Sequence, residues 1–137
     1  MLDKVFDFVG SAGKVTAQGC RPAFNTCPNN GGQDAINYIN WCTASKYPGL
    51  QVTYDKVAQT PLEVKSNKSI VGVGSAGVLR GIGLRLVNGV KNVIIQNIHI
   101  TQLNPQYVWG GDAITLAGTD MVWIDHCKVR FTDHSPR

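Results

Sequence analysis

The sequence of 137 residues predicts an all-β parallel solenoid, in which short strands stack coil upon coil. Three segments of the second half can be superposed on one another: LEVKSNKSIVGVG, LRLVNGVKNVIIQN and ITLAGTDMVWIDH (residues 62–74, 84–97 and 114–126). In each, a polar or glycine turn separates an apolar-x-apolar pair from a later apolar run. Short strands that recur at such a period, with no helix between them, are typical of coils that complete one another's backbone hydrogen bonds.

The internal offsets support this superposition. The step from Leu62 to Leu84 is 22 residues and the step from Leu84 to Ile114 is 30, and the second position of each pair repeats both steps. An insertion at residues 103–111 accounts for the longer step, and insertions in solenoids form loops on one face, often the binding face. The apolar runs begin at Ile70, Val93 and Val122.

An antiparallel β-sandwich is the alternative, because its strands also recur at regular spacing. The matched offsets favour the solenoid. Asn88–Gly89 is the one candidate for a two-residue hairpin, and it lies inside the repeated turn rather than between consecutive strands.

The first half of the chain predicts a more irregular region. Residues 4–9 indicate a short strand, and residues 19–32 are rich in turn-forming residues. Residues 33–42 place apolar side chains at helical spacing and predict a short helix. Alternation over residues 50–54 predicts a half-buried strand. We therefore expect one domain over residues 1–137, with coils mainly at 50–129 and an atypical tail at 130–137.

Composition limits the classes of function. The net charge of +4 comes from scattered basic residues, and no nucleic-acid-binding motif accompanies them, so a polyanionic substrate suits this charge equally well. No run of 18 apolar residues is present, and we expect no membrane span.

Four cysteines stand at Cys20, Cys27, Cys42 and Cys127, and three of them lie within 23 residues of a loop-rich stretch. These three cysteines form no CxxC pair and no histidine lies near them, so we expect no zinc or other metal. We interpret the cluster as cysteines that form disulfide bonds in an extracellular protein. Four cysteines allow three pairings. The first ten residues, which include Asp3 and Asp7, do not show an export signal.

Five segments resemble fungal pectin lyases, a branch of the pectate lyase superfamily. They are NGGQDAINYINWCT, SNKSIVGVGSAGV, NVIIQNI, YVWGGDAIT and MVWIDHCKV (residues 30–43, 66–78, 92–98, 107–115 and 121–129). The resemblance covers about residues 5–129, in the family's order and spacing. It implies a right-handed single-stranded parallel β-helix, of which this chain would be an N-terminal fragment.

The resemblance also implies an activity, the eliminative cleavage of α-1,4-linked galacturonan that carries methyl esters. A base removes the C5 proton of a sugar unit, and the 4-linked oxygen leaves. The methyl ester is uncharged and withdraws electrons, so it makes the C5 proton more acidic without a metal ion. Pectate lyases recruit Ca²⁺ for this purpose, whereas pectin lyases use no cofactor. Methyl-esterified pectin is therefore the expected partner, with no nucleic acid or membrane, and the expected location is extracellular.

By resemblance, Asp112 occupies the position of a calcium-ligand aspartate and remains in the cleft without metal. Trp109 and Trp41 match aromatic residues that line the substrate cleft, although Trp41 can equally pack its helix onto the solenoid. We expect Trp123 to be a packing residue. In the family the segment containing Asp125 and His126 is mainly structural, with polar side chains bonding to a neighbouring coil.

The family pairs the first loop cysteine with the one in NWC, here Cys20 with Cys42. The usual partner of Cys27 would lie beyond Arg137, and Cys127 would be an inward-facing free thiol. Of the remaining residues, His99 falls on an outward strand position and His134 in an unmatched tail. The triplet at residues 67–69 fits the glycosylation pattern, which is common by chance.

The catalytic base of the family, an arginine, is not found in this chain. Arg130 matches the calcium-replacing arginine too loosely to assign, and residues 131–137 resemble no part of the family. We therefore expect a chain that is inactive alone. The alternative is a non-catalytic β-helix that binds pectin through Trp41 and Trp109.

Overall fold

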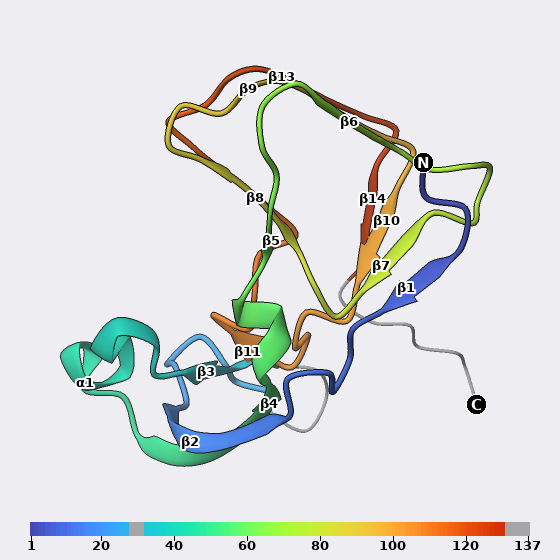
Figure 1. The fold of residues 1–137 in the computed structure, drawn as a ribbon. Coiled ribbons are helices and arrows are strands. Elements are labelled where there is room, and N and C mark those ends of the chain that lie inside the picture. The colour runs from blue at the N-terminus through green and yellow to red at the C-terminus, as the bar shows by residue number, and fades with distance from the viewer. Residues whose placement is uncertain (28–31, 131–137) are drawn as a thin grey trace.

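The computed structural model describes residues 1–27 and 32–130, and it contains three parallel sheets that enclose a triangular prism (Figure 1). We call these three sheets the coil stack. The first sheet has the order β5-β8-β12, the second β6-β9-β13 and the third β1-β7-β10-β14. Their strands are β5 (Leu62–Glu63), β8 (Leu84–Val87), β12 (Ile114–Ala117), β6 (Lys68–Val71), β9 (Lys91–Gln96), β13 (Asp120–Asp125), β1 (Val5–Asp7), β7 (Val78–Arg80), β10 (His99–Thr101) and β14 (Lys128–Arg130).

The register confirms the superposition of the three segments and the parallel β-helix. Leu84 lies opposite both Leu62 and Ile114, as the offsets predict. Val93 lies opposite Val122 as predicted, but Ile70 pairs with Ile95 instead of with Val93. This displacement is two residues, so each side chain keeps its face, because strand side chains alternate with a period of two.

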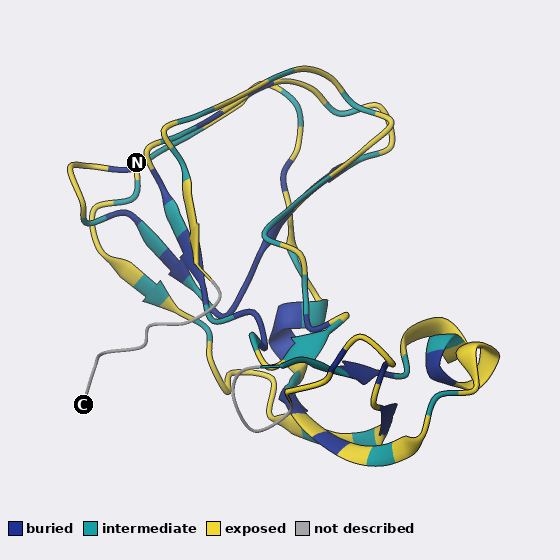
Figure 2. Cartoon of the chain, turned by 180° about the vertical axis from the view of Figure 1, so that it is seen from behind, coloured by how far each residue is buried: buried dark blue, intermediate teal, exposed yellow. Residues whose placement is uncertain are grey.

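The interior of the coil stack is filled by aliphatic side chains from all three sheets. Leu86, Ile95 and Ile100 are fully buried and belong to one cluster with Leu79 and Val93. Each coil completes the inner surface of the next, which a single coil of short strands cannot do alone. Figure 2 shows that buried residues follow the strands, whereas the region around α1 is largely exposed.

Asparagines in the left-handed conformation turn corners of the stack. Asn67, Asn92 and Asn97 have φ values of 60°, 58° and 54°. Asparagine tolerates this region better than most residues with a side chain, because its short polar group can bond locally. The Asn92 amide nitrogen donates to the Asn67 side-chain oxygen at 2.8 Å, which links equivalent corners of adjacent coils.

Beside the stack lies a fourth sheet with the order β11-β3-β2-β4, which we call the lobe together with its helices. Strand β2 runs antiparallel to β3 and β4, and β11 pairs parallel with β3. The elements are β2 (Lys14–Cys20), β3 (Asp34–Ile36), β4 (Gly49–Asp55), β11 (Tyr107–Val108), the 3-10 helices η1 (Tyr38–Asn40) and η2 (Lys56–Gln59), and α1 (Trp41–Ser45). The lobe sheet is therefore mainly antiparallel. The β-sandwich alternative for the repeated segments is wrong, because their strands pair in parallel.

The lobe corrects two sequence predictions. The helix predicted at residues 33–42 is wrong in its first half, which is β3. Ala35 and Ile36 are both buried but pack into different clusters, as neighbouring residues of a strand do and those of a helix face do not. The predicted turn region from Gly19 also begins too early, because β2 continues to Cys20.

Trp123 is a third correction, because its side chain is 66% exposed rather than packed. Its register partner in β9 is Ile94, which is also exposed, and the inward-facing pair beside them is Val93 with Val122. Trp123 therefore lies on the outer side of the second sheet. The short strands predicted at residues 4–9 and 50–54 are confirmed as β1 and β4.

The helices in the described part of the chain are short. None of them is long and apolar enough to cross a membrane.

Candidate functional site

An open pocket of about 230 Å³ lies where the lobe meets the first sheet of the coil stack. Its wall on the lobe side comes from η1, η2 and the insertion at residues 103–111, and its wall on the stack side comes from β8 and β12. The lining residues are Tyr38, Ala58, Gln59, Pro61, Arg85, Trp109, Gly111, Asp112 and Thr115.

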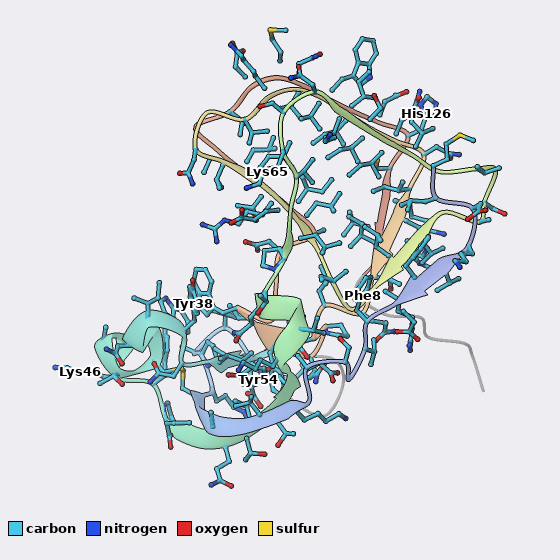
Figure 3. All side chains as sticks on the ribbon, viewed as in Figure 1. Phe8, Tyr38, Lys46, Tyr54, Lys65 and His126 are labelled. Carbon is cyan, nitrogen blue, oxygen red and sulfur yellow. A yellow bond between two sulfur atoms is a disulfide. The ribbon has the colours of Figure 1, made fainter. Side chains whose placement is uncertain are left out.

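Aromatic rings form one side of this pocket. Tyr38 and Trp109 stack with centroids 6.1 Å apart and an interplanar angle of 29°, and their side chains are 49% and 45% exposed. Figure 3 shows Tyr38 projecting from the lobe toward the stack. Trp41 contacts Trp109 edge-on at 6.0 Å and Tyr47 at 5.5 Å. Trp41 is partly buried, so it supports Trp109 from behind and does not line the pocket.

The insertion is held in place by the lobe. Strand β11 pairs with β3, and the Tyr107 hydroxyl accepts a hydrogen bond from the Thr53 amide at 3.2 Å. The Gln59 side chain donates to the Trp109 carbonyl at 3.1 Å. Gly111 has a φ of 146° and lies so close to the Ala58 carbonyl that a side chain would collide with it, which explains a glycine here.

Asn104 clamps the base of the insertion. It is 3% exposed, and its side-chain oxygen accepts from the Asp55 amide at 2.8 Å. Its amide nitrogen donates to the carbonyls of Asp55 and Gly110, both at 2.9 Å. The Asn104 side chain thus makes two hydrogen bonds to β4 and one to the insertion, and these bonds fix the loop that carries Trp109.

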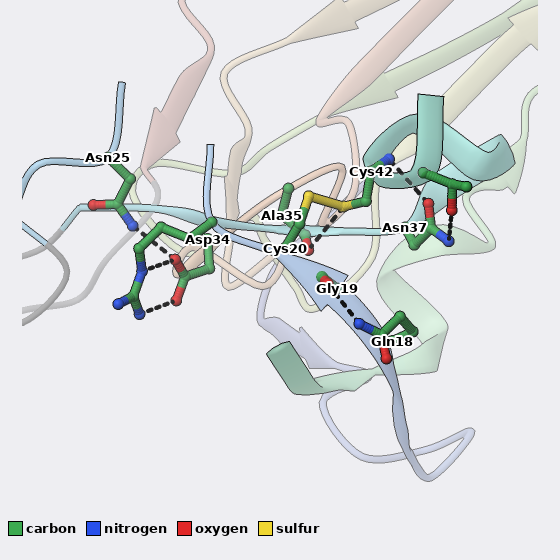
Figure 4. The surroundings of a disulfide bond; sticks show 10 residues. Gln18, Gly19, Cys20, Asn25, Asp34, Ala35, Asn37 and Cys42 are labelled. Carbon is green, nitrogen blue, oxygen red and sulfur yellow. Dashed lines mark hydrogen bonds and ion pairs between the residues drawn. A yellow bond between two sulfur atoms is a disulfide. The ribbon is translucent and has the colours of Figure 1, made fainter. Parts of the chain in front are cut away.

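The disulfide predicted by resemblance, Cys20 to Cys42, is present with a sulfur–sulfur distance of 2.02 Å (Figure 4). It joins β2 to α1 and so fixes Trp41, the neighbour of Cys42. The Cys42 amide also donates to the Asn37 side-chain oxygen at 3.0 Å. Together these contacts position the ring that lies behind Trp109.

An ion pair close to this disulfide holds β3. The Asp34 carboxylate accepts two hydrogen bonds from the Arg21 guanidinium, at 2.8 and 3.0 Å, and one from the Asn25 amide at 2.8 Å. The hydrogen bond from Arg21 is the largest cause that lowers the pKa of Asp34, against a smaller effect of burial. Since β3 pairs with β11, this network also supports the insertion.

Polar groups form the other side of the pocket. Asp112 is exposed, and the Thr115 hydroxyl donates to its carboxylate at 3.5 Å. Thr115, Arg85 and Glu63 lie opposite one another on the outer face of β12, β8 and β5. Glu63 pairs with Lys65 at 2.8 Å, and this contact, more than the nearby Arg85, lowers the pKa of Glu63. Within the described residues Arg85 forms no ion pair, so its charge is available to a ligand.

The described lining of the pocket offers few ligands to a calcium ion. Among the described residues that line it, Asp112 is the single carboxylate, and the guanidinium of Arg85 shares the same cavity. Calcium in proteins takes six to eight oxygen ligands, several of them carboxylates, and a neighbouring cation opposes its binding.

Asp125 and His126 lie away from this pocket, at the end of β13. The Asp125 carboxylate accepts from Gln96 of the adjacent coil at 2.9 Å and contacts the His126 ring at 2.7 Å. His126, then Gln96, lowers the pKa of Asp125. A contact between coils is what the resemblance implies for this segment, although His126 itself is 81% exposed.

The two other cysteines carry free thiols. Cys127 packs against the core and donates to the Ile95 carbonyl at 3.6 Å, in agreement with an inward-facing thiol, and Cys27 is exposed. His134 and residues 131–137 lie outside the described residues.

Sequence reasoning missed several residues of the site, Thr115 among them. Arg85 alternates with the buried Leu84 and Leu86, so its outward position was readable from the pattern. Tyr38, Gln59 and Asn104 carried no local signal, because their roles arise from contacts between segments far apart in the chain.

Comparison with known proteins agrees with the fold. Residues 29–136 match the family model described as pectate lyase. The chain is 61% identical over 132 residues to a probable pectin lyase F of Aspergillus niger, covering 94% of this chain and 27% of that protein. It is 56% identical over 130 residues to a pectin lyase of Colletotrichum gloeosporioides, covering 93% of this chain and 33% of that protein. The chain thus spans about a third or less of the length of these relatives, and it belongs to the pectate lyase family.

Proposed function

We propose that this chain forms the first coils and one wall of the cleft of a pectin lyase, and that it binds methyl-esterified galacturonan in the pocket beside Trp109. The observation that carries the proposal is the pairing of the exposed Tyr38 and Trp109 rings with Asp112, Thr115 and Arg85 across one open pocket. The relatives named pectin lyase supply the substrate class.

The two sides of the pocket suit the two sides of a sugar unit. A pyranose ring exposes C–H groups on its faces and hydroxyl or carboxyl oxygens at its edges. The Tyr38 and Trp109 rings offer flat apolar surface for the faces. Arg85 and Thr115 can donate hydrogen bonds to ester or hydroxyl oxygens, and the Asp112 carboxylate can accept them from hydroxyl groups.

This arrangement binds and orients a chain but supplies no assigned base for removing the C5 proton. Elimination needs a group that accepts this proton and stabilisation of the negative charge that develops on the adjacent carboxyl. Arg85 can contribute to the second requirement. We therefore expect the 137-residue chain to bind pectin and, by itself, to give no unsaturated product.

Binding can be measured by isothermal titration calorimetry of the chain with highly methylated pectin oligomers, a readout that does not depend on the tryptophan being replaced. Trp109→Ala should weaken binding about tenfold, or about 1.4 kcal/mol, because it removes a ring face from the pocket. Trp123→Ala is the matched control, since Trp123 is exposed on a different sheet, and it should leave the Kd unchanged.

Absorbance of unsaturated product on the same pectin tests the second expectation. Turnover equal to that of a complete pectin lyase would show that this chain does contain a competent base. Equal affinities of the Trp109→Ala and wild-type chains would show that the pocket is not the binding site.

We further propose that the chain acts outside the cell. The disulfide between Cys20 and Cys42 supports this location, because such bonds persist in oxidising compartments. Immunodetection of the chain in the culture medium, as opposed to the cell extract, tests it.

A further inference from the structure

The corner between β5 and β6 contains Asn67–Lys68–Ser69, the single Asn-x-Ser/Thr triplet of the sequence. All three residues are exposed, and Asn67 has a φ of 60° at the tip of the turn. We propose that Asn67 is an acceptor for an N-linked oligosaccharide. The inference rests on the export proposed above and is independent of pectin binding.

Hydrogen bonding leaves the reacting atom of Asn67 available. Its backbone amide donates to the Lys91 carbonyl at 3.1 Å, and its side-chain oxygen accepts from Asn92 at 2.8 Å. Its Nδ2 atom has no hydrogen-bond partner within residues 1–27 and 32–130. A sugar on Nδ2 therefore removes no hydrogen bond from the described fold, and the link to Asn92 keeps the side chain oriented outward.

The other corner asparagines differ in this respect. The Asn92 Nδ2 donates to Asn67, and the Asn97 Nδ2 donates to the carbonyls of Gly72 and Gly74 at 3.0 and 2.8 Å. A sugar on either of them would compete with a contact between segments. Among these three corner asparagines, the one in the triplet is therefore the one whose side-chain Nδ2 donates no hydrogen bond within the described residues.

The transfer itself needs a lipid-diphosphate-linked oligosaccharide as co-reactant. The Asn67 nitrogen forms a bond to C1 of the first sugar, the C1–oxygen bond to the diphosphate breaks, and the nitrogen loses one proton. The lipid diphosphate leaves with the bonding electrons. The Ser69 hydroxyl, exposed on β6, completes the acceptor motif.

The position also suggests what the sugar does. Strands β5 and β6 are the outermost strands of their sheets, and Asn67 lies at the corner that joins them. Open strand edges tend to pair with other chains, and a bulky hydrated group beside them obstructs that pairing. Asn67 is not among the residues that line the pocket, so we expect a sugar there to leave the pocket open.

The test expresses the 137-residue chain behind a secretion signal in yeast. Peptide mapping detects the disulfide between Cys20 and Cys42, which shows that the chain entered the oxidising compartment. Treatment with a peptide amidase that removes N-linked sugars converts a sugar-bearing asparagine into aspartate. We expect this conversion at residue 67 together with one downward step in apparent mass. Asn67→Gln and Ser69→Ala should each abolish both signals. The matched control Asn88→Gln, at another exposed corner asparagine outside any such triplet, should keep them.

Chain retained in the cells is mapped in the same way, so that a variant which folds poorly still reports its modification. An unmodified Asn67 in material that contains the disulfide would overturn the proposal. The shielding role has its own readout: enzymatic removal of the sugar should increase light scattering on concentration while the pectin Kd stays the same. Unchanged scattering would overturn that role.

Discussion

The coil stack and the lobe differ in what holds them together. The main core cluster contains twelve buried apolar residues, most of them from the coils. The lobe contributes Val57 and Ala58 to it and otherwise has two clusters of three buried residues. The lobe adds a disulfide, the Arg21–Asp34 ion pair and the Asn104 hydrogen bonds.

This difference follows from how much apolar surface each part can bury. Coils stack and share one inner surface, so hydrophobic burial is continuous along the stack. A small antiparallel sheet buries less, and specific cross-links compensate for that deficit. The pocket lies at the junction, where the aromatic side comes from the cross-linked lobe and the polar side from the repetitive stack.

The strongest test of the stack is Leu86→Ala. Leu86 is fully buried at the centre of the middle coil, and its truncation leaves a cavity, so we expect a loss of about 4 kcal/mol in the free energy of unfolding. Denaturant unfolding followed by circular dichroism measures it. Ile94→Ala, at a 41% exposed position of β9, is the control and should cost less than about 1 kcal/mol. Equal losses would mean that the inner surface is not the source of stability.

The lobe should respond most to loss of its disulfide. Replacing Cys20 and Cys42 together by alanine opens a loop with a sequence separation of 22 and should cost about 3 kcal/mol. Amide hydrogen exchange should accelerate in β2, β3 and β4 while β8 and β9 stay protected. Cys27→Ala, which removes an exposed free thiol, should change neither region. Faster exchange in all strands alike would contradict the division into two regions.

Removal of the Asn104 side chain tests how the lobe positions the pocket. Asn104→Ala deletes three hydrogen bonds of a buried side chain and should cost about 2 kcal/mol, with weaker pectin binding because Trp109 is no longer fixed. Glycine adopts the φ of 48° without strain but lacks the hydrogen bonds, so Asn104→Gly should be nearly as destabilising as Asn104→Ala. This comparison distinguishes the loss of the hydrogen bonds from backbone strain in the alanine variant. Gln106→Ala, on the exposed part of the same loop, is the control for both thermal melting and titration.

The smallest expected effect is a dependence of stability on pH through Asp34. Its pKa is lower in the folded chain than in the unfolded one, so the ion pair stabilises above the ordinary aspartate pKa, near 3.9, and this contribution is lost as the pH falls through the lower folded value. Asp34→Asn should cost about 1 kcal/mol at neutral pH and reduce the acid sensitivity of unfolding. Unfolding measured at about pH 6 and about pH 3 tests this. Asp3→Asn, an exposed position with no ion pair in the described residues, should leave the sensitivity unchanged.

Much of the coil stack was predictable because its signals are local. The spacing of Leu62, Leu84 and Ile114 predicted their alignment, since each coil repeats the same turn and the same alternation. The resemblance added the Cys20–Cys42 bond and drew attention to Trp109 and Asp112. Both of these residues line the pocket.

The lobe was predictable only in part. Ala35 and Ile36 fit a helical pattern equally well, and a short apolar run does not distinguish a helix from a strand. The segment is a strand because β3 pairs with both β2 and β11, and β11 lies about seventy residues further along the chain. Tyr38 and Asn104 likewise depend on partners far away in the sequence, Trp109 for Tyr38 and Asp55 for Asn104.

The sequence by itself therefore determined the repeating architecture, the cysteine chemistry through the resemblance, and the loop that bears Trp109. Only the tertiary structure decided that Trp123 faces outward, that Arg85 and Tyr38 share a pocket, and that the Asn67 amide is not used by the fold. The reason is physical: a repeat encodes its own neighbours at a constant spacing, whereas contacts between the lobe and the stack depend on register and loop closure over long separations.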